Sequence, residues 1–131
     1  DLLDEYGVPY QRPAGGPRHL HRCQKVLPNL PKEEFIAQTL AVELYLEAGI
    51  RGVEIGSILA DRDPETHENR YPALELLRLA IPRRVYTDNH IRVIAAACRN
   101  IYERREEITH GYRITFEAPI LRHFTVELEK I

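Results

Sequence analysis

The most constraining feature of the sequence is an apolar run, residues 74–86, whose middle carries a single charge, Arg78. Its apolar residues fall on both sides of an extended strand, so we expect both faces of a central strand to be covered. A guanidinium keeps its proton, and burying one without a partner costs several kcal/mol. Arg78 should therefore face a carboxylate such as Glu54 or Glu75, or a cleft that admits one. From the strand alone the internal ion pair is the commoner outcome.

The remaining patterns predict two helices and several further strands. A helix opens near residues 30–34, carries an apolar stripe and ends at Gly49. A second helix follows Thr87, a good N-cap. Strands are predicted before the first helix, over residues 50–59, 112–116 and 121–128, besides the central one. We therefore predict an α+β two-layer sandwich, with two helices on one face of a mainly antiparallel sheet.

Composition narrows the class of protein. A length of 131 residues suits one domain, and a net charge of -2 gives no basic field for nucleic acid and no polybasic membrane anchor. No stretch approaches the roughly 20 apolar residues of a membrane span, and the first residues lack the positive start of a signal peptide. We expect a soluble, cytoplasmic protein that binds neither nucleic acid nor membrane. Cys23 and Cys98 are expected to be free thiols.

Four segments, in this order, match one enzyme family: residues 13–16, residues 48–57, residues 77–83 with Tyr86, Thr87 and His90, and residues 121–125. The chain resembles the C-terminal part of the aromatic amino-acid β-eliminating lyases, pyridoxal-phosphate enzymes that comprise tryptophanase and tyrosine phenol-lyase. Such long ordered matches are far more specific than a short motif. The resemblance implies that residues 1–131 form the small C-terminal domain of a fold-type I pyridoxal-phosphate enzyme.

The resemblance also implies an activity for the complete protein. That activity is β-elimination from L-tryptophan to give indole, pyruvate and ammonia, in a homotetramer that uses pyridoxal 5'-phosphate and a monovalent cation such as K+. The family's Schiff-base lysine lies upstream, and none of the lysines here, Lys25, Lys32 and Lys130, falls in a cofactor motif. We therefore expect a fragment that binds no cofactor and is inactive alone.

The resemblance assigns four site residues. The arginine that matches Arg78 binds the substrate α-carboxylate, for which a planar bidentate donor is suited. Ile55 and His123 match the tryptophanase branch, whereas phenol-lyases carry arginine and phenylalanine there. An apolar wall suits indole, so we assign Ile55, His123 and the adjacent Phe124 to substrate binding, and His123 also to catalysis through proton transfer or hydrogen bonding.

Two alternatives remain open. Residues 71–72 and 82–86 are more typical of the phenol-lyase branch, which favours tyrosine as substrate. The chain could also be a non-catalytic amino-acid-binding module, or the product of a damaged gene, that uses Arg78 to hold a carboxylate. Activity on tyrosine without activity on tryptophan would establish the first alternative. Heat of tryptophan binding to the isolated chain would support the second.

Residues 17–23, Pro-Arg-His-Leu-His-Arg-Cys, depart from the family. The family has a histidine and an apolar strand there, His-Ala-Ile-Tyr-Ile-Asp-Ala. Codons CCA-CGC-CAT-CTA-CAT-CGA-TGC encode the observed residues, and the same bases shifted by one encode the family strand. We hypothesise a frameshifted window that weakens local packing. The rival, a metal-binding loop through His19 and His21, is disfavoured because the flanking arginines repel cations.

The loop of residues 61–70 is polar. Its acidic residues lack the spacing of a calcium-binding loop, which favours a solvated loop. The family has glycine where this chain has Asp61, so we expect an altered turn there.

Overall fold

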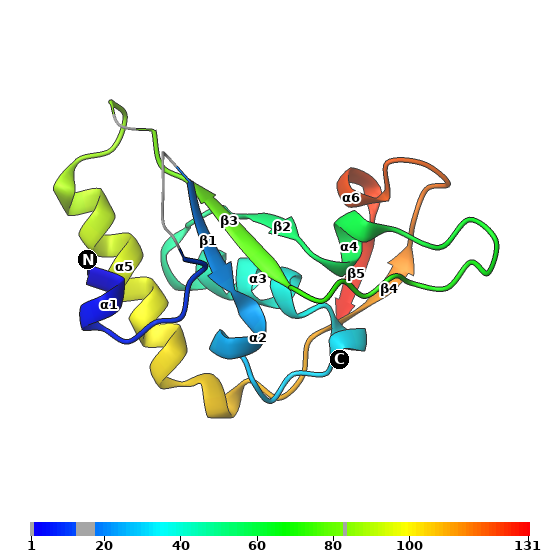
Figure 1. Cartoon of the computed structure of the whole chain (residues 1–131), viewed down its shortest axis with the longest axis horizontal. Helices are drawn as coiled ribbons and strands as arrows, with labels where there is room; N and C mark the ends of the chain where they lie inside the picture. Colours follow the sequence, from blue (N-terminus) through cyan, green and yellow to red (C-terminus); the bar gives the residue numbers. More distant parts are fainter. Residues whose placement is uncertain (1, 13–17, 83) are drawn as a thin grey trace.

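The computed structural model describes residues 2–12, 18–82 and 84–131, and for Arg18 and His19 the backbone alone. It is an α+β structure, as predicted, drawn in Figure 1. Its elements, in order, are α1 (Leu2–Glu5), β1 (Arg18–Arg22), α2 (Cys23–Val26), η1 (Lys32–Glu34), α3 (Ile36–Ala48), β2 (Val53–Ile55), α4 (Ser57–Ala60), β3 (Leu76–Ala80), α5 (Asp88–Glu103), η2 (Arg105–Glu107), β4 (Tyr112–Phe116), α6 (Arg122–Thr125) and β5 (Glu127–Lys130).

The predicted central strand is β3, which lies between β1 and β2 in a three-stranded antiparallel sheet. Leu77 and Leu79 are buried on one face of β3, whereas Leu76 and Arg78 on the other are only half-buried. The prediction that both faces are covered was therefore wrong for this chain. The apolar run of β3 has residues for two buried faces, but the described helices pack on one.

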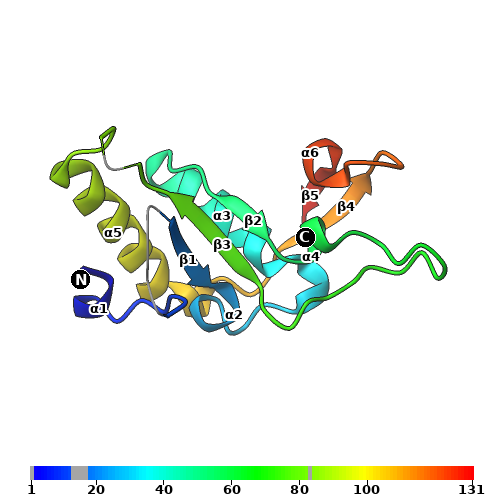
Figure 2. The same ribbon diagram turned by 45° about the horizontal axis from the view of Figure 1, so that its top comes forward.

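Two long helices cover the buried face. α3 packs against β2, β3 and α5, and in Figures 1 and 2 it runs behind β2 and β3. α5 reaches β1, where the Sγ of Cys98 lies 3.6 Å from Nε2 of the buried His21. Leu40, Leu44, Leu77 and Ile101 are among the residues of this single core. The predicted packing of two helices against one sheet face is therefore present.

Of the three helix ends predicted from the sequence, two agree with the structure. α3 ends at Gly49, whose φ of 67° is one that glycine adopts readily. Thr87 caps α5, because its hydroxyl accepts from the N–H of His90 while Nδ1 of His90 accepts from the N–H of Thr87. The predicted start of the first helix was too early, since Phe35, at φ 56°, separates the 3-10 turn η1 from α3.

Within the window of residues 17–23, Arg18–Arg22 forms β1 and Cys23 begins α2, whereas Pro17 lies outside the described residues. β1 pairs with β3 over five residues, with His21 opposite Leu77 on the buried face. The strand therefore forms although its residues do not alternate between apolar and polar. Whether the window weakens packing stays a prediction.

The C-terminal segment differs most from the prediction. β4 and β5 form a separate two-stranded antiparallel sheet, and in both views it lies at the opposite end of the molecule from α1 and α5 (Figures 1 and 2). The last predicted strand was wrong over residues 121–125, because Arg122–Thr125 is the helical turn α6. His123 and Phe124 therefore lie on a turn and not on opposite faces of a strand. No helix in the described part of the chain is long and apolar enough to cross a membrane.

Candidate functional site

The half-buried side of the three-stranded sheet carries the predicted substrate arginine. We call this surface the open sheet face, made of Leu20, Val53, Ile55, Leu76 and Arg78. These residues share one side because Leu20 and Val53 are the register partners of Arg78, and Ile55 is the partner of Leu76. The structure therefore brings two predicted site residues, Arg78 and Ile55, to the same surface.

The guanidinium of Arg78 has no carboxylate partner among the described residues. Its Nε is buried, and its N–H donates a hydrogen bond to no described residue. The alternative of an internal ion pair with Glu54 or Glu75 was wrong, because both acids bond elsewhere. A buried N–H without a partner is unfavourable by about 1–3 kcal/mol, and an incoming carboxylate would remove that penalty.

Glu54 and Glu75 are buried and bond to main-chain N–H groups at helix starts. Glu54 accepts from the N–H of Ile58 (3.2 Å) and of Leu59 (3.0 Å) in α4. Glu75 accepts from the N–H and hydroxyl of Ser57 and from the N–H of Ala37 in α3. These contacts satisfy donors that a helix start leaves free, and they fix α4 against β2 and β3.

Gly56 is the residue that lets the two acids lie together. A Cβ on Gly56 would lie 2.6 Å from Oε1 of Glu54 and in still closer contact with Oε2 of Glu75. Burial, reinforced by the charge of Glu75 and opposed by backbone hydrogen bonds and by Arg122, raises the pKa of Glu54 to about 7. Glu54 therefore changes its charge close to neutral pH.

His123, on α6, contacts the edge strand β2. Its Nε2 donates to the main-chain oxygen of Glu54 (3.0 Å) and lies 3.6 Å from Oε2 of the same residue. Because Glu54 precedes Ile55, His123 sits beside the strand that presents Ile55. Phe124 makes an edge-on contact with the His123 ring at 5.0 Å, but it is 80% exposed. Three of the four predicted residues thus gather at β2 and β3, while Phe124 projects from α6.

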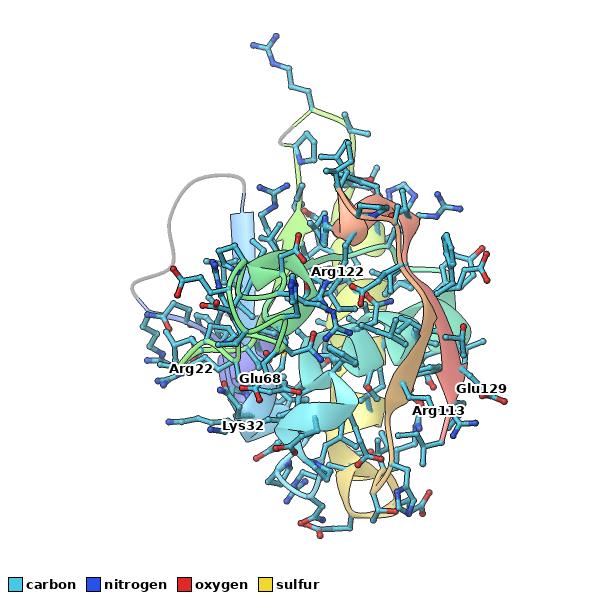
Figure 3. The ribbon with its side chains drawn as sticks, turned by 90° about the vertical axis from the view of Figure 1, so that its right-hand side faces the viewer. Arg22, Lys32, Glu68, Arg113, Arg122 and Glu129 are labelled. Atoms are coloured by element: carbon cyan, nitrogen blue, oxygen red, sulfur yellow. The ribbon has the colours of Figure 1, made fainter. Side chains whose placement is uncertain are left out.

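Arg122 holds α6 in place and was not singled out from the sequence. It is 1% exposed and donates to the main-chain oxygens of Ser57 (2.7 Å) and Ile58 (3.2 Å). It also donates to the side chains of Asn69 and Glu117. Figure 3 shows Arg122 inside the fold, whereas Arg113 and Glu129 lie at its surface. Its position in the matched segment 121–125 was the available signal.

The lysines of this chain do not fit a Schiff-base site. Lys25, Lys32 and Lys130 are all exposed, on α2, η1 and β5, and none belongs to the open sheet face. A lysine that binds an aldehyde cofactor sits in an enclosed site that lowers its pKa. No group of three or more His, Cys, Asp or Glu that could hold a metal ion occurs among the described residues.

The described residues thus form a small α+β unit with an unpartnered arginine Nε on its open sheet face. Residues 1–97 match the family model described as beta-eliminating lyase. A probable beta-eliminating lyase of Trichomonas vaginalis is 67% identical over 129 residues, which are 98% of this chain and 28% of that protein. The chain belongs to the beta-eliminating lyase family.

Other relatives include both branches of that family. The tyrosine phenol-lyase of Symbiobacterium sp. is 43% identical over 131 residues, covering 100% of this chain and 28% of that protein. The tryptophanase of Salinibacter ruber is 46% identical over 129 residues, which are 98% of this chain and 27% of that protein. The chain thus spans less than a third of the length of these curated relatives. Overall identity does not separate the two substrates.

Proposed function

We propose that this chain is the substrate-binding C-terminal part of a pyridoxal-phosphate-dependent lyase that performs β-elimination on L-tryptophan, giving indole, pyruvate and ammonia. The observation that carries the proposal is the unpartnered Nε of Arg78 on the open sheet face, in a chain of the beta-eliminating lyase family. The cofactor, when bound, supplies the electron sink for the reaction. The residues of this chain bind and orient the substrate.

Arg78 would hold the α-carboxylate through paired hydrogen bonds, which fixes the direction of the α-hydrogen. Ile55, on the same face, would form an apolar wall for the aromatic ring. His123, beside β2, would exchange a proton or hydrogen bond with that ring, and Phe124 would add apolar contact. An uncharged residue at position 55 supports indole, because a phenol oxygen would be better matched by a cationic partner.

The cofactor itself would be held by residues outside 1–131, since none of the lysines described above fits that role. The chain alone is therefore expected to be inactive. The monovalent cation, the homotetramer and the cytoplasmic location belong to the proposal for the complete protein.

A chimera tests the proposal. The matching 129-residue segment of the Trichomonas vaginalis relative is replaced by this chain, and pyruvate release is measured with L-tryptophan and L-tyrosine. We expect pyruvate and indole from tryptophan. The parent enzyme and a chimera carrying Arg78→Ala are the controls.

The same assay separates the alternatives. Activity on tyrosine alone would assign the phenol-lyase function, which the 43% identity to the Symbiobacterium enzyme supports as second candidate. No activity on either substrate would contradict the lyase proposal. In that case heat of tryptophan binding to the isolated chain would favour a non-catalytic binding module, and we expect none.

A further inference from the structure

The imidazole of His123 is held by one residue, Glu54, through its main chain and its side chain together. Nε2 lies 3.0 Å from the main-chain oxygen of Glu54 and 3.6 Å from its Oε2. Both neighbours are hydrogen-bond acceptors, so Nε2 carries the ring proton. Nδ1, on the other side of the ring, is buried and bonded by no described residue.

We propose that Glu54 is a positioning residue that fixes His123 with its proton on Nε2 and leaves Nδ1 as the unprotonated nitrogen of the ring. The inference rests on the proposed function, because that proposal places His123 beside the substrate ring. The bond made by one ring nitrogen sets which nitrogen is free to accept, as in metal and catalytic sites whose histidine is oriented by a carboxylate or carbonyl.

Both partners are rigid, which is what a positioning role requires. The Glu54 carboxylate is held by the N–H groups of Ile58 and Leu59, so it cannot swing away from the ring. α6 is held by Arg122, whose guanidinium is bonded to the carbonyls of α4. The distance between Glu54 and His123 is therefore set by α4, to which both are tied.

The other titratable or charged groups near Glu54 come from three elements. Glu75, just before β3, raises the pKa of Glu54, and Arg122 on α6 lowers it. The buried thiol of Cys23 on α2 has a pKa raised by burial and by both acids, so it stays neutral. Since the Glu54 pKa is about 7, its ionised form faces Nε2–H above that pH and its protonated form below. The preference for the Nε2–H tautomer should therefore strengthen as pH rises through neutrality.

Long-range proton–nitrogen NMR spectra of the full 131-residue chain test the inference, because they distinguish a protonated from a bare ring nitrogen. At about pH 8, the wild-type His123 should show a protonated Nε2 and a bare Nδ1. Glu54→Gln keeps the main-chain oxygen but removes the charge, and should lower the ratio of the Nε2–H to the Nδ1–H tautomer about fivefold. Glu75→Gln is the matched control, a buried acid without contact to His123, and should leave the ratio unchanged.

A wild-type His123 protonated on Nδ1, or equal tautomer ratios in the two variants, would overturn the inference. Should Glu54→Gln fail to fold, the wild-type spectrum decides alone: a single Nε2–H tautomer supports the inference, and a mixture contradicts it. Experiments on the chimera distinguish a failure of this inference about Glu54 from a failure of the proposed function. An inactive chimera with the expected spectra removes the lyase proposal and leaves Glu54 as the residue that fixes the tautomer. An active chimera in which Glu54→Gln and Glu75→Gln have the same pH profile of kcat removes the positioning role alone.

Discussion

Replacing Gly56 by alanine would put a methyl group between two buried carboxylates. The new Cβ would lie 2.6 Å from Oε1 of Glu54 and closer still to Oε2 of Glu75. Real Cβ atoms essentially never come so near an oxygen, so both carboxylates would have to move. The φ of Gly56 is −156°, outside the positive range that favours glycine, so the predicted effect is worked out from space alone.

The size of the effect follows from the hydrogen bonds at risk. Moving Glu75 breaks its contacts with the N–H groups of Ser57 (2.8 Å) and Ala37 (3.2 Å), and moving Glu54 breaks the one with Ile58. A hydrogen bond to a charged group contributes roughly 1.5–3 kcal/mol. Losing about two of them should lower the free energy of unfolding by about 3–6 kcal/mol.

Urea unfolding of the 131-residue chain, followed by circular dichroism, measures this loss. Gly49→Ala is the matched control, because a Cβ there meets nothing within 4 Å and only the positive φ of 67° is unfavourable. That strain should cost about 1–2 kcal/mol. If Gly56→Ala is no more destabilising than Gly49→Ala, the account of the two acids around Gly56 is wrong.

Three further predictions concern single side chains. Asp61, at φ 62° and ψ −168°, occupies a backbone region essentially restricted to glycine. Asp61→Gly should therefore raise the free energy of unfolding by about 1 kcal/mol. Asp61→Ala keeps the strain and loses the 3.5 Å ion pair with Arg122, so it should lower the free energy of unfolding. In the chimera, Arg78→Ala should raise KM for the amino acid about thirtyfold or more, the loss of at least ~2 kcal/mol of charge pairing, and an unchanged KM would remove Arg78 from the site. Because the pKa of Glu54 is raised, the folded state binds more protons than the unfolded state between about pH 4.5 and about pH 7. The free energy of unfolding should therefore fall by on the order of 1–3 kcal/mol as pH rises through that range. Glu54→Gln should reduce this pH dependence, as measured by urea unfolding.

The sequence was sufficient for elements whose pattern and packing agree. The apolar run around Arg78 is the central strand, and Thr87 caps α5. It was insufficient where a tertiary contact overrides a local pattern. Phe124, Val126 and Leu128 alternate with polar residues as in a strand, but the carbonyls of α4 bind Arg122 and hold its neighbours in a helical turn.

The site divides in the same way. Arg78 and Ile55 could be placed on one face, because alternation along neighbouring strands is a local property. The contact between Glu54 and His123 could not, since the two residues are 69 positions apart and meet only through α4 and α6. We predicted from the apolar content of β3 that both faces are covered. Whether a face is covered depends on the whole layer packed against it and not on the strand alone.

Alternation also explains why Arg78 stays unpaired beside acidic neighbours. Glu54 lies on the buried face of β2, whereas Arg78 lies on the open sheet face of β3, so the sheet separates the two charges. A carboxylate placed on the open sheet face should therefore form an ion pair with Arg78. Val53 is the register partner of Arg78 and is 37% exposed, which makes it the position to change.

In the chimera, Val53→Glu should place a carboxylate opposite the guanidinium and compete with the substrate. A cross-strand ion pair of this kind contributes roughly 0.2–1 kcal/mol, so KM should rise about two- to fivefold while the stability of the isolated chain is unchanged or slightly higher. Val53→Gln has the same shape without the charge and controls for the altered surface. Equal KM values for the two variants would mean that Arg78 does not bind the substrate carboxylate, because competition at the guanidinium is the only difference between them.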